Sequence, residues 1–361
     1  MKKKLILLVK LAVSVTILTV VVVNARRANP TLFAEFIDRP KNWGLLIAAW
    51  ALCMTGVLIT FLRWYYLVRA LELPFRVRDA LRLGFLGYMF NFVSLGSVGG
   101  DLFKAVFIAR EHPRRKAEAI STLIVDRAVG LYALLVMAAA AVLIVGLPTE
   151  DPNIRVINDA AVVGSVVGCV LMTLILLPGF STGPLAEFFS GLPKVGGTFA
   201  QLFRAVRMYR RRLDVLIWTC LMSLVNHGLY AIGLFLLATG LAGGDTATLA
   251  EHFVIVPLGW VAAALPLPLG ALGAFEGAVD YLYAHVPQAS LPPGEGLLVA
   301  LGYRVITVVI ATVGIGFFLS SRREVADVWH EAEHELEEME GQTASAELPE
   351  ASTANLQQDA K

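Results

Sequence analysis

Long apolar segments separated by short polar loops dominate the chain. About 20 apolar residues are needed to cross the roughly 30 Å hydrocarbon core of a bilayer as a helix, and each of these segments is long enough. The pattern therefore predicts an all-α, polytopic integral membrane protein. The candidate spans are Leu5–Val23, Trp43–Leu67, Leu83–Ala109, Ile120–Gly146, Ala160–Pro178, Val215–Gly240, Phe253–Tyr283 and Gly296–Leu319.

The first segment has two interpretations. Three lysines precede the apolar run, as in a secretory signal peptide, and Val23-Asn24-Ala25 is a weak cleavage site. The run is nevertheless long enough to cross the bilayer, which favours a first transmembrane helix.

The charge of the loops indicates which segments cross, because Lys and Arg accumulate on the cytoplasmic side. Leu83–Ala109 lies between two basic stretches, and Phe253–Tyr283 lies between two that are acidic or uncharged. We therefore predict two re-entrant hairpins of opposite sense and about six full spans, with both termini in the cytoplasm. The basic stretches are Arg69–Arg82, Arg110–Lys116 and Lys194–Arg212, and the non-basic ones are Glu150–Asp159, Gly243–Glu251 and His285–Glu295.

An eight-span topology is the alternative, but it would place the basic Lys194–Arg212 loop outside, against the charge bias. The two hairpin segments also resemble each other, since each contains G-x-x-G followed closely by an acid. An inverted repeat would produce this arrangement, although small residues also allow membrane helices to pack closely. The two motifs are Gly96-Ser97-Val98-Gly99-Gly100-Asp101 and Gly270-Ala271-Leu272-Gly273-Ala274-Phe275-Glu276.

Composition supports a membrane protein and separates a tail from the body. The chain is 57% hydrophobic and 16% charged, with a mean hydropathy of +0.68, so it has too few charged residues to cover a soluble globule. Residues 1–323 carry 29 Lys and Arg against 18 Asp and Glu, whereas residues 324–361 carry 11 acids and Lys361 as their single base. We predict a transmembrane domain over 1–323 and an acidic cytoplasmic tail over 324–361, helical at first and then disordered.

Four ionisable residues within apolar segments are the main candidates for function. A charged side chain at the bilayer centre costs about 2.5–3.5 kcal/mol on insertion scales, so each needs a partner or a water-filled cavity. Asp101 and Lys104 are three residues apart and can pair on one helix face, and Arg304 is the natural counter-charge for Glu276. The two pairs could fix helix register alone, or they could form a ligand site.

The glycine turns favour an anionic ligand. Free backbone N–H groups and the positive end of the helix dipole suit a phosphate, and the glycines precede two predicted helices. The implied ligand is a phospholipid headgroup. Asp126 and Arg127 could form an entry-side pair, but an ordinary interfacial anchor is favoured, and Asn91 fits a hydrogen bond between helices better than a ligand contact. The candidate substrate-binding set is Asn91, Gly96, Gly99, Gly100, Asp101, Lys104, Arg127, Gly270, Gly273, Glu276 and Arg304.

Neither a metal site nor a nucleotide-binding loop is predicted. His330 and His334 share a helix face but lack a third ligand, and the three cysteines stand singly in apolar runs. No G-x-x-x-x-G-K-[ST] loop occurs, so any transport would be downhill, ion-coupled or driven by consumption of the lipid on the far side. An intramembrane enzyme would use Asp101 and Glu276 as acid and base but would lack a nucleophile. We expect a protein that is not an enzyme and has no cofactor.

Taken together, these motifs resemble the flippase-like membrane domain of the lysylphosphatidylglycerol synthase family, which also occurs as stand-alone proteins. The similarity covers most of residues 43–320. The matching pieces are Asn91 through Gly96-Ser97-Val98-Gly99-Gly100-Asp101-Leu102-Phe103-Lys104, then Asp126-Arg127, then Pro266-Leu267-Pro268-Leu269-Gly270-Ala271-Leu272-Gly273-Ala274-Phe275-Glu276-Gly277, then Tyr303-Arg304.

The chain departs from the family pattern at four positions. The pattern usually has a proline where Leu95 stands, commonly an arginine in place of Lys104, and a second glycine at Leu269. Many members also have an arginine where Phe275 stands. These departures bear on the headgroup preference rather than on the fold.

The resemblance implies a function in lipid movement. In the full-length synthases the membrane domain moves aminoacylated lipid between leaflets, and a separate soluble domain makes that lipid from aminoacyl-tRNA. Only residues 320–361 follow the last predicted span, so we expect no such synthetic domain. We expect a translocator in the bacterial cytoplasmic (inner) membrane whose partners are anionic membrane lipids and not nucleic acid. The alternative is a non-catalytic accessory subunit for a lipid-modifying or glycosyl-transferring enzyme, with the acidic tail as its docking segment.

Overall fold

The computed structural model describes most of the chain between residues 29 and 320. The described residues are 29–93, 99–145, 196–242, 245–264, 273–286 and 291–320, with short pieces at 19, 22–23, 26–27, 155–156, 159–160, 162–168, 170, 187 and 191. The predicted first span, the candidate residues Gly96 and Gly270, and the acidic tail therefore lie wholly or largely outside the described residues. So does most of the predicted span Ala160–Pro178.

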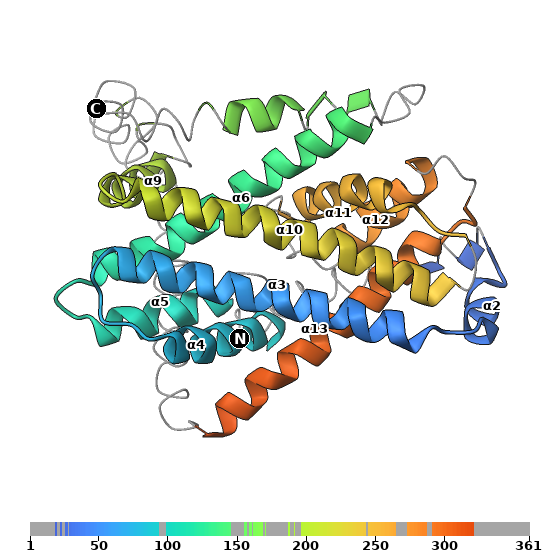
Figure 1. Ribbon diagram of the computed structural model, residues 1–361, viewed down its shortest axis with the longest axis horizontal. Helices are drawn as coiled ribbons and strands as arrows, with labels where there is room; N and C mark the ends of the chain where they lie inside the picture. The colour runs from blue at the N-terminus through green and yellow to red at the C-terminus, as the bar shows by residue number, and fades with distance from the viewer. Residues whose placement is uncertain are drawn as a thin grey trace, which may run out of the picture.

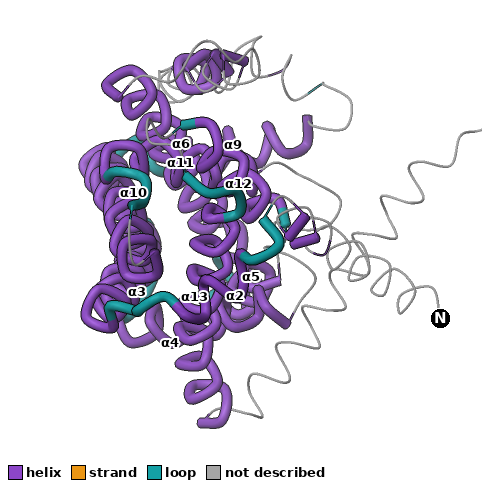
Figure 2. The backbone as a smooth tube through the Cα atoms, turned by 90° about the vertical axis from the view of Figure 1, so that its right-hand side faces the viewer, coloured by secondary structure: helices purple, strands orange, loops and turns teal. Residues whose placement is uncertain are grey.

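The described residues form an all-α structure, as predicted, and Figure 2 shows no strand among them. Among the described residues, four helices are long and apolar enough to cross a membrane. They expose large apolar side chains, such as Ile47, Ile144 and Ile217, at the surface of the bundle, which is typical of helices that face lipid. These helices are α3 (Trp43–Ala70), α6 (Lys116–Val145), α10 (Leu213–Ala242) and α13 (Glu295–Ser320).

The most extensive packing between two helices joins α3 to α10, which run side by side in opposite directions (Figure 1). Glycines make this approach possible: a Cβ on Gly56 would overlap Asn226, and one on Gly233 would lie 3.0 Å from the sulfur of Cys53. Small residues serve the same purpose in many membrane helix pairs.

Each of the two segments predicted to form a hairpin contains a pair of short helices that pack on each other. In the first hairpin, the rings of Phe90 and Phe103 lie 4.7 Å apart between centroids. In the second, Trp260 and Phe275 lie 4.9 Å apart, and His252 contacts Tyr283 further along the same two helices. The first hairpin is α4 (Val77–Val93) with α5 (Gly99–Glu111), and the second is α11 (Leu249–Ala264) with α12 (Ala274–His285).

The arrangement of the two halves agrees with an inverted repeat. Helices α3–α6 and α10–α13 each follow the order long, short, short, long. The first hairpin packs through α4 on α13 of the other half, and the second packs through α11 on α6. The two hairpins extend into the bundle from opposite ends (Figure 1), as inverted-topology repeats predict.

Two further helices close the ends of the bundle. At one end, α2 (Leu32–Asp38) is tied to the start of α13 by the ion pair of Arg39 with Glu295, whose atoms Nη1 and Oε1 lie 2.5 Å apart. At the other end, α9 (Gly196–Met208) packs on α6, and the hydroxyl of Tyr209 donates to the carbonyl of Leu67 at 2.9 Å.

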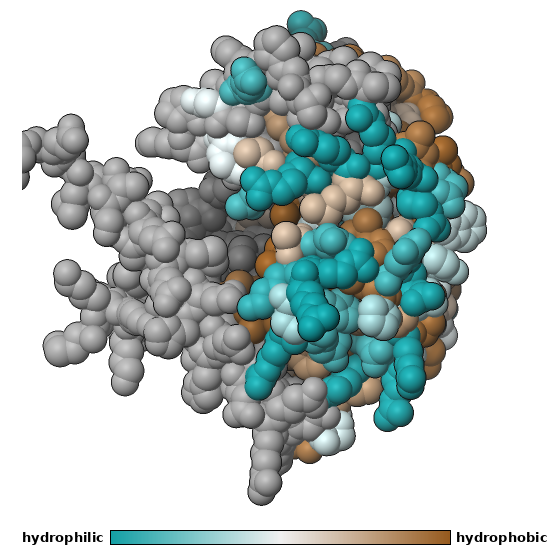
Figure 3. Space-filling model, turned by 90° about the vertical axis from the view of Figure 1, so that its left-hand side faces the viewer, coloured by the Kyte–Doolittle hydropathy of each residue, from teal (hydrophilic) through white to brown (hydrophobic). Residues whose placement is uncertain are grey.

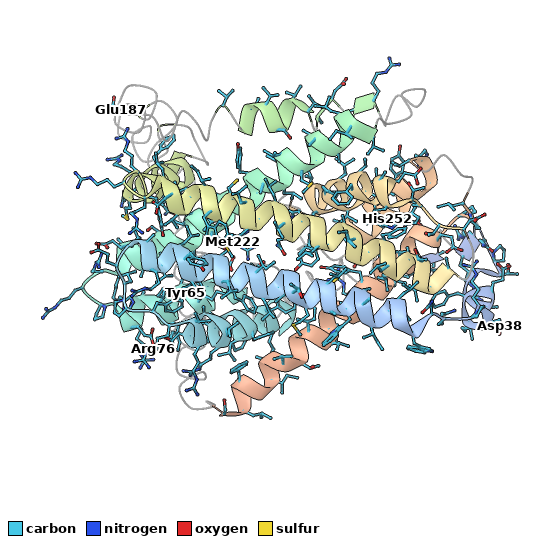
Figure 4. The ribbon with its side chains drawn as sticks, in the orientation of Figure 1. Asp38, Tyr65, Arg76, Glu187, Met222 and His252 are labelled. Carbon is cyan, nitrogen blue, oxygen red and sulfur yellow. The ribbon has the colours of Figure 1, made fainter. Side chains whose placement is uncertain are left out.

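The two ends differ in charge. Figure 4 places Arg76 at one end and Asp38 at the other, and Figure 3 shows hydrophilic side chains gathered over the face at the Arg76 end with apolar ones along its rim. We call this face the basic end. Its arginines and lysines come from the loops and helix ends around Arg69, Arg76, Arg78, Arg114, Arg115, Lys116, Arg207 and Arg211.

Candidate functional site

Each hairpin places a carboxylate in the first turn of its second helix, and each carboxylate pairs with an arginine on the long helix that follows in the chain. In the first half, Asp101 of α5 pairs with Arg127 of α6. In the second half, Glu276 of α12 pairs with Arg304 of α13. We call these the acid–arginine pairs, and together they form the candidate site.

Asp101 binds two cations. Its Oδ2 accepts a hydrogen bond from Nε of Arg127 at 2.5 Å, and its Oδ1 lies 3.7 Å from Nζ of Lys104. The sequence predicted the contact with Lys104 but not the one with Arg127. The side chain of Asp101 is 24% exposed and that of Arg127 is 57% exposed, so this pair reaches the surface of the bundle.

Lys104 is held by aromatic rings as well as by Asp101. Its ammonium lies 5.5 Å from the ring centroid of Trp64 and 6.0 Å from that of Phe61. Aromatic faces attract a cation most strongly where water is excluded. Gly87 leaves room for the lysine stem, because a Cβ there would lie 2.6 Å from Cε of Lys104. The ammonium is therefore fixed on the inner side of Asp101.

Glu276 is more deeply enclosed, with only 1% of its side chain exposed. Its Oε1 accepts hydrogen bonds from both Nε, at 3.0 Å, and Nη2 of Arg304. Its Oε2 accepts the backbone N–H of Gly273 at 2.8 Å, which caps the start of α12. Gly273 has a φ of 89°, a conformation that glycine adopts without strain. The sequence predicted the pairing with Arg304, and the structure shows it.

The backbone N–H groups expected to bind phosphate are used within the protein. The N–H of Gly100 donates to Oδ1 of Asn91 across the hairpin at 3.0 Å, and the N–H of Gly273 donates to Glu276. Gly99 and Gly100 are buried, and a Cβ on Gly100 would overlap the carbonyl of Gly87. At Gly100 and Gly273, therefore, the glycine allows close packing and capping rather than offering a free N–H to a ligand.

A third ion pair was not predicted. Arg63 of α3 donates to both carboxylate oxygens of Asp126 on α6, at 2.7 and 3.0 Å, and to the hydroxyl of Ser223 on α10 at 2.8 Å. Asp126 is therefore a buried partner and not an interfacial anchor. Arg63, a lone charge inside the apolar run Trp43–Leu67, was the available signal for this contact.

Aromatic side chains position the second hairpin next to its ion pair. The ring of Phe275, the residue before Glu276, lies 4.9 Å from that of Trp260 and 5.5 Å from that of Tyr303, the residue before Arg304. Tyr230 of α10 contacts both Trp260 and Tyr303. This cluster joins four helices, α10, α11, α12 and α13, beside the ion pair and so restricts movement of Glu276 relative to Arg304.

The structure thus gathers the predicted residues into two groups, one in each half. The first contains Asn91, Gly99, Gly100, Asp101, Lys104 and Arg127, and the second contains Gly273, Glu276 and Arg304. In each group a positive side chain lies beside an acid at the start of a helix, an arrangement suited to binding an anion reversibly.

Comparison with known proteins gives one family. The family described as the lysylphosphatidylglycerol synthase TM region matches residues 7–314, and the chain belongs to it. This confirms the resemblance inferred from the motifs, and it indicates a membrane protein with a lipid-related function. Neither a curated protein nor a solved structure matches the chain.

Proposed function

We propose that this multi-pass membrane protein moves an anionic phospholipid or lipid-linked headgroup between the two leaflets. The observation that carries the proposal is the repetition of one acid–arginine pair in two hairpins of opposite direction. Because the two copies of this arrangement point in opposite directions, a headgroup that enters from either leaflet would meet the same kind of anion-binding contacts. Transporters built from inverted repeats place their substrate sites at comparable interrupted helices.

The arginines supply the headgroup contacts. A guanidinium has five N–H donors, and each acid–arginine pair uses those on Nε and Nη2, so the pair itself leaves the Nη1 group for a phosphate. Arg127 is 57% exposed and Arg304 32% exposed, which allows a ligand to approach both. The carboxylates keep the guanidiniums in place when no phosphate is bound.

The first group also attracts anions through its net charge. Asp101 is the single acid beside two bases, Lys104 and Arg127, which leaves a surplus of one positive charge. In the second group, Glu276 and Arg304 balance. We infer that a headgroup binds more tightly at the first group than at the second, and that the basic end, where the first hairpin begins, faces the cytoplasm of a bacterial cell.

The test is leaflet-resolved transfer of labelled phosphatidylglycerol in vesicles of phosphatidylcholine and phosphatidylglycerol that contain the purified protein. Arg127→Gln and Arg304→Gln are each expected to slow transfer roughly tenfold or more, because each removes a charge-assisted hydrogen bond to the phosphate. Arg114→Gln, an exposed arginine in a loop at the basic end, is the matched control and should transfer lipid like the wild type.

Thermal unfolding of each variant in detergent separates a loss of transfer from a loss of folding. Transfer at the wild-type rate by both folded site variants would contradict the proposal. A wild-type protein that transfers neither phosphatidylglycerol nor a lipid-linked anionic headgroup would favour an accessory subunit instead.

A further inference from the structure

Three loops meet at the end of α3 and form one surface at the basic end. The carbonyl of Leu71, just after α3, accepts a hydrogen bond at 2.8 Å from Nη2 of Arg115, in the loop between α5 and α6. The carbonyl of Ala70, the last residue of α3, accepts one at 3.3 Å from Nη1 of Arg212, in the loop between α9 and α10. These side-chain contacts to the backbone hold the three loops next to each other.

This surface carries exposed bases, and we call it the basic loop surface. Its bases stand in the three loops and at the first residues of α4 and α6. None of them forms an ion pair within the part of the chain that the structure describes. They are Arg76, Arg78, Arg114, Lys116 and Arg211.

The acids of the same loops and helix starts are fewer, and two of them already have a basic partner. Glu118 pairs with an arginine of its own loop, and Oδ1 of Asp214 lies 3.6 Å from Nε of Arg212. Asp79 caps the start of α4, where its Oδ2 accepts a backbone N–H at 2.9 Å, and Glu72 is exposed. Two unpaired acids therefore stand against five exposed bases, so the surface is positively charged.

The basic loop surface lies on the end face of the bundle rather than on its lipid-facing sides. Figure 3 shows hydrophilic side chains over this face and apolar ones along its rim. Lipid surrounds the rim of a membrane bundle, whereas the end face is open to water. A water-exposed acidic segment of protein therefore fits this surface better than a lipid headgroup does.

The acidic tail follows α13, whose last residue lies beside the basic loop surface. Ser320 ends α13 and lines a cavity of about 320 Å³ together with Arg76 and Arg78. Residues 324–340 carry eight acids and neither Lys nor Arg. A segment tethered this closely reaches an effective concentration on the order of millimolar at a neighbouring surface. Charge and position thus point to the same occupant.

We propose that the acidic tail docks on the basic loop surface of its own chain, where its carboxylates pair with the exposed arginines and lysine. A single exposed ion pair is weak, but several pairs on one tethered segment act together. Docking weakens as salt is added, because exposed charges are screened. It requires neither a lipid ligand nor transfer between leaflets, so this proposal stands or falls independently of the proposed function.

The experiment joins the docked segments covalently in the full-length protein, held as one copy per nanodisc of phosphatidylcholine. A carbodiimide couples a carboxylate to an amine in contact with it, and Lys116 supplies the amine of the basic loop surface. Peptide mass spectrometry is expected to find Lys116 joined to acids of residues 324–340. The yield should fall roughly tenfold in about 1 M sodium chloride. Absence of this link at low salt, or links from the tail to other lysines alone, would overturn the proposal.

A charge-reversed surface supplies the second readout. In Arg76→Glu/Arg78→Glu, a glutamate-specific protease should cleave the tail roughly fivefold faster than in the wild type, because the tail is undocked more of the time. Both side chains are exposed and acids are favourable at a helix start, so the variant should fold normally. The matched control is Arg26→Glu/Arg27→Glu, which changes two exposed arginines that precede α2 at the other end of the bundle, and it should be cleaved like the wild type.

Two further outcomes would contradict the proposal. Equal cleavage rates in the wild type and in Arg76→Glu/Arg78→Glu would show that the tail does not dock on these arginines. Loss of the link to Lys116 when phosphatidylglycerol replaces phosphatidylcholine would assign the surface to anionic headgroups instead of the tail.

Discussion

The two acid–arginine pairs occupy equivalent positions but are built differently. Glu276 is 1% exposed and uses both oxygens within the protein, one for Arg304 and one for the N–H of Gly273. Asp101 is 24% exposed, and the equivalent capping of the first hairpin is supplied by Asn91, which accepts the N–H of Gly100. In the second half one carboxylate both caps a helix and holds an arginine, whereas in the first half these tasks are divided.

This difference means that Glu276 and Asp101 should contribute differently to stability and to ligand binding. A carboxylate that caps a buried helix end cannot be removed without loss of the local fold. A carboxylate that holds only cations can be changed with less structural damage. We therefore expect substitutions at Glu276 to act mainly on stability, and those at Asp101 to act mainly on lipid transfer.

The largest expected effect is that of Glu276→Ala. It leaves Arg304 without its counter-charge and Gly273 without its cap, and it should lower the free energy of unfolding by about 3 kcal/mol. This is the lower end of the range for breaking a buried pair, because Arg304 is 32% exposed and remains partly hydrated. Thermal unfolding in detergent measures the change.

Glu276→Gln is the matched control. Its side-chain oxygen still accepts the N–H of Gly273 while the charge is lost, so it should be less destabilising than the alanine variant. Equal loss in both variants would show that the cap contributes nothing and that the charge alone matters.

Gly100→Ala tests the close approach within the first hairpin. The added methyl group would overlap the carbonyl of Gly87, so the two helices must separate, at a cost of about 1–3 kcal/mol. Gly316→Ala on α13 is the control, since no atom outside its own helix lies within 4 Å of the position of the added Cβ. Equal unfolding temperatures for Gly100→Ala and Gly316→Ala would mean that the two helices of the hairpin do not pack as closely as described.

Asn91→Ala should have a smaller effect, about 1 kcal/mol, because it removes one capping interaction from the start of α5. Asn91→Asp keeps an acceptor for the N–H of Gly100 and should retain more stability than the alanine variant. Hydrogen exchange at the amide of Gly100 reports this hydrogen bond directly. Faster exchange is expected in Asn91→Ala, and unchanged exchange would show that Asn91 does not accept the N–H of Gly100.

Much of the fold follows from the sequence. The four long described helices and the two hairpins match apolar segments and the charge of their loops, because membrane burial imposes both patterns on the chain. The pairing of Glu276 with Arg304 was also predictable, since isolated charges in apolar helices require partners.

Contacts that depend on how the helices pack were not predictable. Arg127 stands 26 residues after Asp101, and their pairing depends on the packing of α5 against α6. The same holds for Arg63 with Asp126, which lie 63 residues apart. The sequence alone did not show that the N–H groups of Gly100 and Gly273 have acceptors within the protein. Asn91 and Glu276 accept them only when the hairpins are folded.

The most direct test of the account is the rate of phosphatidylglycerol transfer between leaflets by Asp101→Asn, measured in vesicles beside the wild type. The variant keeps the shape of the side chain and removes the charge that holds Arg127 and Lys104. We expect transfer to be slowed roughly tenfold or more, with an unfolding temperature close to that of the wild type. Transfer at the wild-type rate by the folded variant would contradict it.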